Sequence, residues 1–201
     1  MAGLRKFELR KRNSFVILGC EGNNKTEKIY FKNFNSRKCI IKFSTGNSTD
    51  PVGIVQDIVN YIHSEIDIDE DDKIYAIFDT DARQNKQQQI EEACKIAEEN
   101  GIDIIISTPA FELWYLLHYE YTTKTFTSSK ALQSELKKKI QDYSKNNNTF
   151  LKIKESTNQA IENAKKLEKY QLRKGYDLYS YECNPYTEVY KVVEELIRRN
   201  K

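Results

Sequence analysis

Three acidic residues follow two predicted β-strands at the points where these strands end. Glu21 comes directly after the apolar run Phe15–Cys20, and Asp79 and Asp81 follow the apolar run Lys73–Phe78. Because the carboxyl ends of parallel strands meet at one edge of a sheet, residues far apart in sequence can come together there. Alternate residues of an extended chain point the same way, so Asp79 and Asp81 can face one ligand.

Such carboxylates have a definite chemistry. They repel one another, and a hard divalent cation such as Mg²⁺ or Mn²⁺ relieves the repulsion through oxygen ligands. An ion of this kind can polarise a phosphate, activate water or stabilise a leaving oxygen. Acidic residues are also common in turns, and a lone D-x-D is a weak signal. Glu21-Gly22 directly after an apolar strand favours a metal site formed by Glu21, Asp79 and Asp81.

Charged residues beside these acids are further candidates. Lys25 falls near a predicted helix N-terminus, where backbone N–H groups attract anions, so it is either a phosphate contact or a solvated lysine. Arg83 follows the D-x-D and is either a phosphate contact or an ordinary loop residue. Glu27 stands three residues after Asn24, at capping-box spacing, which favours a structural role over that of an extra acid.

A second group lies on a helix predicted from Thr108-Pro109 to about His118. Its aromatic and histidine side chains recur on one face, a pattern more often found in a core than in a site: Phe111, Trp114, Tyr115 and His118. Glu112 lies in the first turns, where the helix dipole favours a carboxylate. Because the helix follows a strand, it starts at the same edge of the predicted sheet as the acids.

The elements that must position these residues alternate along the first part of the chain. The predicted strands are Phe15–Cys20, Cys39–Phe43, Lys73–Phe78 and Ile102–Ser107. Amphipathic helices are predicted after Asn24, from Asp50-Pro51, around Ile90–Ala97 with a cap at Asn100-Gly101, and from Thr108 onward. This order predicts an α/β fold with a mostly parallel sheet flanked by helices.

After Tyr121 the pattern changes to helices and polar loops, without a further predicted strand. The predicted helices are Ser128–Tyr143, Glu155–Arg173 and Pro185–Arg199. Asn184 is expected to cap the last of these, with Pro185 in its first turn. We therefore expect an α/β core over residues 1–122 and a helical C-terminal region over residues 123–201 packed on it.

Composition limits the class of protein. The chain has 201 residues, of which 39% are hydrophobic and 31% charged, as in ordinary globular proteins. No apolar run is long enough to span a membrane and no apolar signal core is apparent, so a cytoplasmic protein is expected. The four cysteines form no C-x-x-C pair, which argues against a zinc ribbon and favours reduced core residues.

Charge gives a weaker indication of partners. The formal net charge is only +2, which neither indicates nor excludes nucleic-acid binding. Basic residues gather late in the chain with tyrosines among them, either as a nucleic-acid surface or as solvated helix faces. The basic groups are Lys137–Lys139, Lys165-Lys166, Lys169, Arg173-Lys174 and Arg198-Arg199.

At this point the motifs resemble a known family. Glu21-Gly22 after one strand and Asp79-x-Asp81 after another resemble the Toprim pattern of topoisomerases, primases and OLD-type nucleases. Three longer segments resemble the RloB family: Ile17–Phe31 (ILGCEGNNKTEKIYF), Ser107–His118 (STPAFELWYLLH) and Asn184–Leu196 (NPYTEVYKVVEEL). RloB-like proteins, which include the AbiLii component of the AbiL abortive-infection system, carry a Toprim-like domain. They are associated with prokaryotic antiviral defence, often beside an ATPase partner.

The resemblance implies roles for individual residues. Glu21 would be a general acid/base or a metal ligand, and Asp79 and Asp81 would hold Mg²⁺ or Mn²⁺. The Phe-Glu…His pattern of the family makes Glu112 and His118 second-rank catalytic candidates. The function implied is that of a metal-dependent nuclease acting on DNA or RNA in an antiviral defence system, with an ATPase partner protein and an oligomer compatible with the sequence.

Two other functions remain open. The chain could be a non-catalytic subunit that binds or senses nucleic acid, and since it lacks a G-x-x-x-x-G-K-[ST] motif, any ATP use must come from a partner. A phosphatase or phosphotransferase of the HAD type also places D-x-D after a strand. Arg83 stands where that type would have Thr or Val, which weighs against it.

Overall fold

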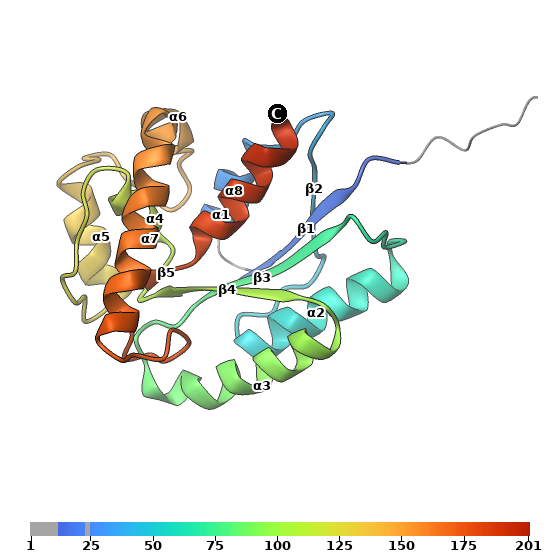
Figure 1. Ribbon diagram of the computed structural model, residues 1–201, viewed down its shortest axis with the longest axis horizontal. Coiled ribbons are helices and arrows are strands. Elements are labelled where there is room, and N and C mark those ends of the chain that lie inside the picture. Colours follow the sequence, from blue (N-terminus) through green and yellow to red (C-terminus); the bar gives the residue numbers. More distant parts are fainter. Residues whose placement is uncertain (1–11, 23–24) are drawn as a thin grey trace, which may run out of the picture.

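A five-stranded sheet with the strand order β2-β1-β3-β4-β5 forms the centre of the molecule (Figure 1). The computed structural model describes residues 12–22 and 25–201, with Lys25 described only in its backbone. The strands are β1 (Phe15–Cys20), β2 (Ile40–Phe43), β3 (Lys73–Asp79), β4 (Asp103–Thr108) and β5 (Tyr186–Thr187). The first four are parallel to one another, and β5 runs antiparallel to β4.

Helices cover both faces of this sheet. They are α1 (Lys25–Lys32), α2 (Pro51–Ser64), α3 (Gln87–Glu99), α4 (Glu112–Leu117), α5 (Ser129–Lys137), α6 (Phe150–Ile153), α7 (Thr157–Arg173) and α8 (Val189–Asn200), with short 3₁₀ turns at Gln84–Lys86 and Lys154–Ser156. Helices α2 and α3 lie against one face, and α1, α4 and α8 lie on the other (Figure 1). Within the described ranges, no helix has the length and apolar character that a membrane span requires.

The central strands are apolar because both of their faces are buried. In β1, Val16 and Leu18 face the core shared with α1, α4 and α8, whereas Ile17 faces the core formed with α2 and α3. The same alternation holds in β3, where Ile77 and Phe78 enter opposite cores. Parallel strands buried on both faces have this nearly continuous apolar sequence. The predicted α/β class, mostly parallel sheet and helical C-terminal region are confirmed.

The prediction that no strand follows Tyr121 was wrong, and so was the predicted start of the last helix. Tyr186 and Thr187 form β5, and α8 begins only at Val189. The side chain of Asn184 does not cap a helix, because its oxygen accepts from the Phe126 N–H at 3.1 Å and its nitrogen donates to the Phe126 carbonyl at 2.8 Å. Two residues are too few to give a strand pattern in sequence.

Two other helix boundaries differ from those predicted. Helix α4 begins at Glu112 instead of Thr108, because the preceding segment is held against the end of β3. There the Asp81 N–H donates to the Pro109 carbonyl at 3.0 Å, and the Phe111 N–H donates to Asp79 Oδ1 at 2.8 Å. Helix α5 ends at Lys137, and the chain continues to residue 143 in turns.

The two segments of the chain, before and after residue 122, share one hydrophobic core. Val16 and Trp114 belong to the same buried cluster as Leu167 and Leu196. Strand β5 adds residues of the later segment to the sheet of the earlier one. Asn163 on α7 donates to the carbonyl of Leu117 at 2.7 Å and so caps the C-terminal end of α4. The C-terminal region therefore fixes α4, the helix that carries Glu112.

The acidic loop at residues 67–72 ends in a buried carboxylate that ties β1 to β3. Asp72 accepts hydrogen bonds from Arg12 at 2.5 and 3.1 Å and from the Phe15 N–H at 2.6 Å. Burial alone would raise the pKa of Asp72, but hydrogen bonds from Arg12 and from backbone N–H groups lower it. Asp72 therefore stays ionised and fixes the amino ends of the two central strands.

We expect the substitution Asp72→Ala to lower the free energy of unfolding by about 2–3 kcal/mol, because it removes the partner of Arg12 and leaves the Phe15 N–H without its acceptor. Urea unfolding at neutral pH measures the change. The matched control is Asp67→Ala in the same loop, an exposed position where the loss should stay within about 0.5 kcal/mol. Equal effects of the two substitutions would contradict the role of Asp72.

Candidate active site

The carboxyl ends of β1 and β3 lie side by side and bring the predicted acids to one edge of the sheet. The two strands are neighbours, with Cys20 paired to Ile77. Glu21 follows β1 directly and is half-buried, and Asp79 is the last residue of β3 and is buried. Helix α1 starts after the first of these strands and α4 after β4. This pairing places Glu21 and Asp79 at the same edge of the sheet, as the sequence predicts.

Four carboxylates occupy this corner of the fold, three of them buried. Glu27 and Glu112 each retain 1% exposure and Asp79 retains 6%. Burial raises the pKa of Asp79 well above its usual range, and the negative charges of Glu27, Glu112 and Glu21 raise it further. Burial is likewise the main reason that the pKa of Glu27 rises to about 8, with Glu112 and Glu21 contributing. The four side chains form what we call the acidic cluster: Glu21, Glu27, Asp79 and Glu112.

The C-terminal region holds one member of the acidic cluster in place. Glu112 Oε1 accepts a hydrogen bond from Tyr143 Oη at 2.9 Å and another from Gln133 Nε2 at 3.0 Å. Lys145 Nζ lies 3.6 Å from the same oxygen. The two donors and Lys145 come from α5 and from the segment that follows it, so the helical C-terminal region holds Glu112 in place.

The D-x-D turn separates its two aspartates. Asp79 is turned inward, where its Oδ1 accepts from the Phe111 N–H. Asp81 instead forms an ion pair with Lys86 at 2.7 Å, and Lys86 also donates to the Asp79 carbonyl at 3.2 Å. Asp81 and Ala82 both adopt left-handed backbone conformations, with φ of 53° and 52°. Two successive non-glycine residues of this kind mark a strained turn, a feature that clusters at functional sites.

His118 lies at the C-terminal end of α4, six residues after Glu112 and therefore about 9 Å along the helix axis. Its Nδ1 lies 2.8 Å from the Trp114 carbonyl, and its ring packs edge-on against Trp114. Burial lowers the pKa of His118 to about 4. The imidazole is therefore neutral at physiological pH. The structure does not bring it among the acids, and a catalytic role for it stays a prediction.

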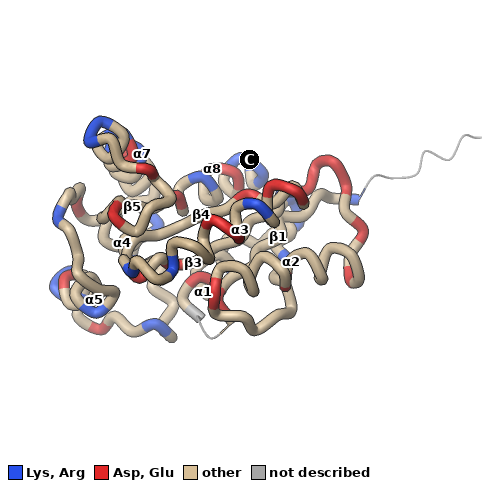
Figure 2. Tube along the Cα trace, turned by 90° about the horizontal axis from the view of Figure 1, so that it is seen from below, with Lys and Arg blue, Asp and Glu red and all other residues tan. Residues whose placement is uncertain are grey.

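The structure gives little support to the basic residues that were predicted to contact phosphate or nucleic acid. Arg83 is exposed on the turn after Asp81. Lys25 is the first residue of α1, but its side chain lies outside the described residues, as does the proposed cap Asn24. The basic residues of α5, α7 and α8 are spread over several helices (Figure 2). Several pair with acids, with nitrogen–oxygen distances of 2.6–3.1 Å: Lys138 with Glu135, Lys139 with Glu120, Lys165 with Glu194 and Arg198 with Glu195.

Two members of this site were not predicted as such. Glu27 was assigned to capping, yet it stands three, four and seven residues before Tyr30, Phe31 and Phe34. An acid on the apolar face of a helix is a signal that could have identified it. Lys145 gave no signal, because it lies in a polar loop that only the fold brings to the acids.

The acidic cluster can be tested for its fit to a divalent cation. Its oxygen donors are those that Mg²⁺ and Mn²⁺ prefer, and the charges of all four carboxylates act on the ammonium group of Lys145. Within residues 12–22 and 25–201, however, no three His, Cys, Asp or Glu side chains are arranged as a metal-binding group. The oxygen donors thus suit a divalent cation in their chemistry, although the described side chains are not arranged around one.

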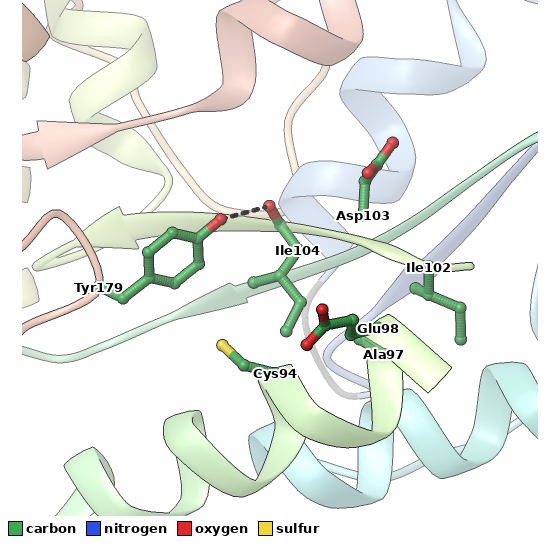
Figure 3. Close-up of a pocket in the computed structure, with 7 residues that line it drawn as sticks. All are labelled: Cys94, Ala97, Glu98, Ile102, Asp103, Ile104 and Tyr179. Carbon is green, nitrogen blue, oxygen red and sulfur yellow. Dashed lines mark hydrogen bonds between the residues drawn. The ribbon is translucent and has the colours of Figure 1, made fainter. Parts of the chain in front are cut away.

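A separate pocket of about 450 Å³ lies at the other end of β4. It is lined by residues of α3, the start of β4 and Tyr179, whose hydroxyl donates to the Ile104 carbonyl at 3.4 Å (Figure 3). None of the acidic cluster or of the predicted site residues lines it. This pocket is therefore separate from the candidate site at the carboxyl edge of the sheet.

The fold and the acidic cluster together define an α/β protein with a buried acidic centre at the carboxyl ends of its parallel strands. The family profile described as RloB-like protein matches residues 16–196, and the chain therefore belongs to the RloB-like family. Searches among curated proteins and among solved structures returned no significant match. The resemblance to the RloB family is confirmed.

The raised pKa of Glu27 predicts an unusual pH dependence of stability. Because the folded protein binds this proton more tightly than the unfolded chain, the free energy of unfolding should fall as the pH rises from about 4.5 to about 8. Urea unfolding in the presence of a chelator measures the fall. Glu27→Gln should make the profile flatter, whereas Glu98→Gln, at an exposed site on α3, should leave it unchanged. An identical slope for wild type and Glu27→Gln would contradict the account.

Proposed function

We propose that this protein is a metal-dependent nuclease that hydrolyses phosphodiester bonds of DNA or RNA. The observation that carries the proposal is the acidic cluster at the carboxyl edge of the sheet, where three buried carboxylates and Glu21 lie together in an RloB-like protein. A buried excess of negative charge is costly unless protons or a cation compensate it, and a divalent cation can replace the protons that the raised pKa values of Asp79 and Glu27 indicate. Mg²⁺ or Mn²⁺ bound there would polarise the phosphate and lower the pKa of a bound water.

The residues of the chain would divide the remaining work. Asp79, Glu27 and Glu112 would supply buried oxygen ligands, with Glu112 oriented by Tyr143 and Gln133. Glu21 is less buried than the other three acids, so it suits proton transfer at the attacking water or a place among the ligands. Asp81 could join the ligands only by giving up its ion pair with Lys86.

The motifs of the family support this assignment by their positions. The segment Ile17–Phe31 spans β1 and α1 and contains Glu21 and Glu27. The segment Ser107–His118 spans the end of β4 and α4 and contains Glu112. The third, Asn184–Leu196, contributes β5, which pairs with β4. All three segments thus form or support the edge that carries the acids.

The direct test is cleavage of labelled DNA and RNA, single- and double-stranded, by the full chain with Mg²⁺ or Mn²⁺. Asp79→Asn should lower the rate by about 100-fold or more, because it removes an anionic ligand of the divalent cation. The control Asp103→Asn lies at the opposite, amino-terminal end of β4 and should retain the wild-type rate. Circular dichroism should give the same spectrum for both variants.

Cleavage that survives both Asp79→Asn and Glu21→Gln at the wild-type rate would overturn the proposal. Absence of cleavage of every substrate with every metal, combined with co-purification of an ATPase, would overturn it in favour of a non-catalytic binding subunit. The proposed biological setting is prokaryotic antiviral defence beside an ATPase partner, in keeping with the family. The compartment proposed for that role is the cytoplasm.

A further inference from the structure

Among the described side chains, Lys145 places a positive charge beside the acidic cluster, and it comes from a loop far along the chain. Its Nζ lies 3.6 Å from Glu112 Oε1. Its backbone is anchored at the same place, because Thr26 Oγ1 on α1 donates to the Lys145 carbonyl at 3.2 Å. The loop thus bridges α1 and α4, the two helices that carry Glu27 and Glu112.

The side chain of Lys145 is positioned to move. It retains 44% exposure, whereas its partner Glu112 retains 1%, so the ammonium group lies on the solvent side of a buried carboxylate. The separation of 3.6 Å is longer than a direct charge-assisted hydrogen bond, and an exposed, flexible lysine loses little when such a contact is broken. By contrast, Tyr143 and Gln133 hold Glu112 with hydrogen bonds of 2.9 and 3.0 Å.

Several carboxylates, and not one alone, act on the positive charge of Lys145. Partial burial alone would lower the pKa of Lys145, but the carboxylates of Glu112, Asp79 and Glu27 raise it, with Glu21 adding to the effect. Its one positive charge therefore interacts with several acids and not with a single partner. A divalent cation entering the same acids would meet this charge and be repelled by it.

We propose that Lys145 is an internal counter-ion that competes with the divalent cation for the acidic cluster, and that its displacement leaves the ammonium group facing the phosphate of the substrate. This inference rests on the proposed function and adds a regulatory step to it. Without the divalent cation, the single charge of Lys145 offsets part of the negative charge of the acids. With the cation bound, the same ammonium is free at the mouth of the site, where an anionic phosphate would approach.

Two binding measurements with the full-length protein test the proposal. Isothermal titration with Mn²⁺ alone should show that Lys145→Met lowers the Kd for the metal by about 3- to 30-fold, because a competing charge has been removed. Fluorescence anisotropy with a labelled single-stranded oligonucleotide in Ca²⁺ should show that the same variant binds the oligonucleotide several-fold more weakly. Lys145→Arg keeps the charge and should stay within about twofold of wild type in both measurements.

The opposite signs of these two effects distinguish a counter-ion from a structural residue, whose loss would weaken both kinds of binding. The matched control is Lys165→Met, which removes an exposed lysine paired with Glu194 and should change neither Kd. If wild type binds Mn²⁺ but Lys145→Met leaves the Kd unchanged or higher, the inference alone is wrong. If wild type binds no Mn²⁺ and Asp79→Asn behaves identically, the proposed metal-dependent function is wrong as well.

Discussion

Four carboxyl groups lie close together at one end of the sheet, and the repulsion between their negative charges has to be offset for the fold to be stable. They belong to Glu21, Glu27, Asp79 and Glu112. The parallel pairing of β1 with β3 brings two of them together, and α1 and α4 supply the other two. Such a concentration of buried acids destabilises a protein unless protons, an ammonium group or a metal ion compensate it. The proposed metal-dependent function follows from the need for that compensation.

The helical C-terminal region also helps to offset the repulsion between these acids. It supplies hydrogen-bond donors to Glu112 from Gln133 and Tyr143, and it supplies the charge of Lys145. It also contributes β5 to the sheet and packs α7 and α8 against the core that contains α4. A site built from both parts of the chain requires their relative position to be fixed, and the shared hydrophobic core fixes it.

The sequence was informative where the physical signal is local. Apolar runs located the four parallel strands, and the cap at Asp50 and the left-handed Gly101 were confirmed at the ends of their helices. Strand β5 was not predicted because two residues are too few to give a strand pattern. The role of Asn184 was predicted wrongly because its side chain binds the backbone of Phe126, far away in sequence, instead of capping a helix. Family motifs placed Glu112 among the candidates, but the contribution of Lys145 depends on a tertiary approach that no local pattern encodes.

The proposed nuclease function requires a divalent cation to bind among these carboxylates. The most direct measurement is anomalous diffraction from crystals of the protein grown with Mn²⁺, with data collected near the manganese absorption edge. The account predicts a strong anomalous peak within coordination distance of Asp79 and Glu112, and a Lys145 side chain that has moved away from Glu112. Crystals that show no peak at the carboxyl ends of β1 and β3, or a peak only at unrelated surface acids, would contradict it.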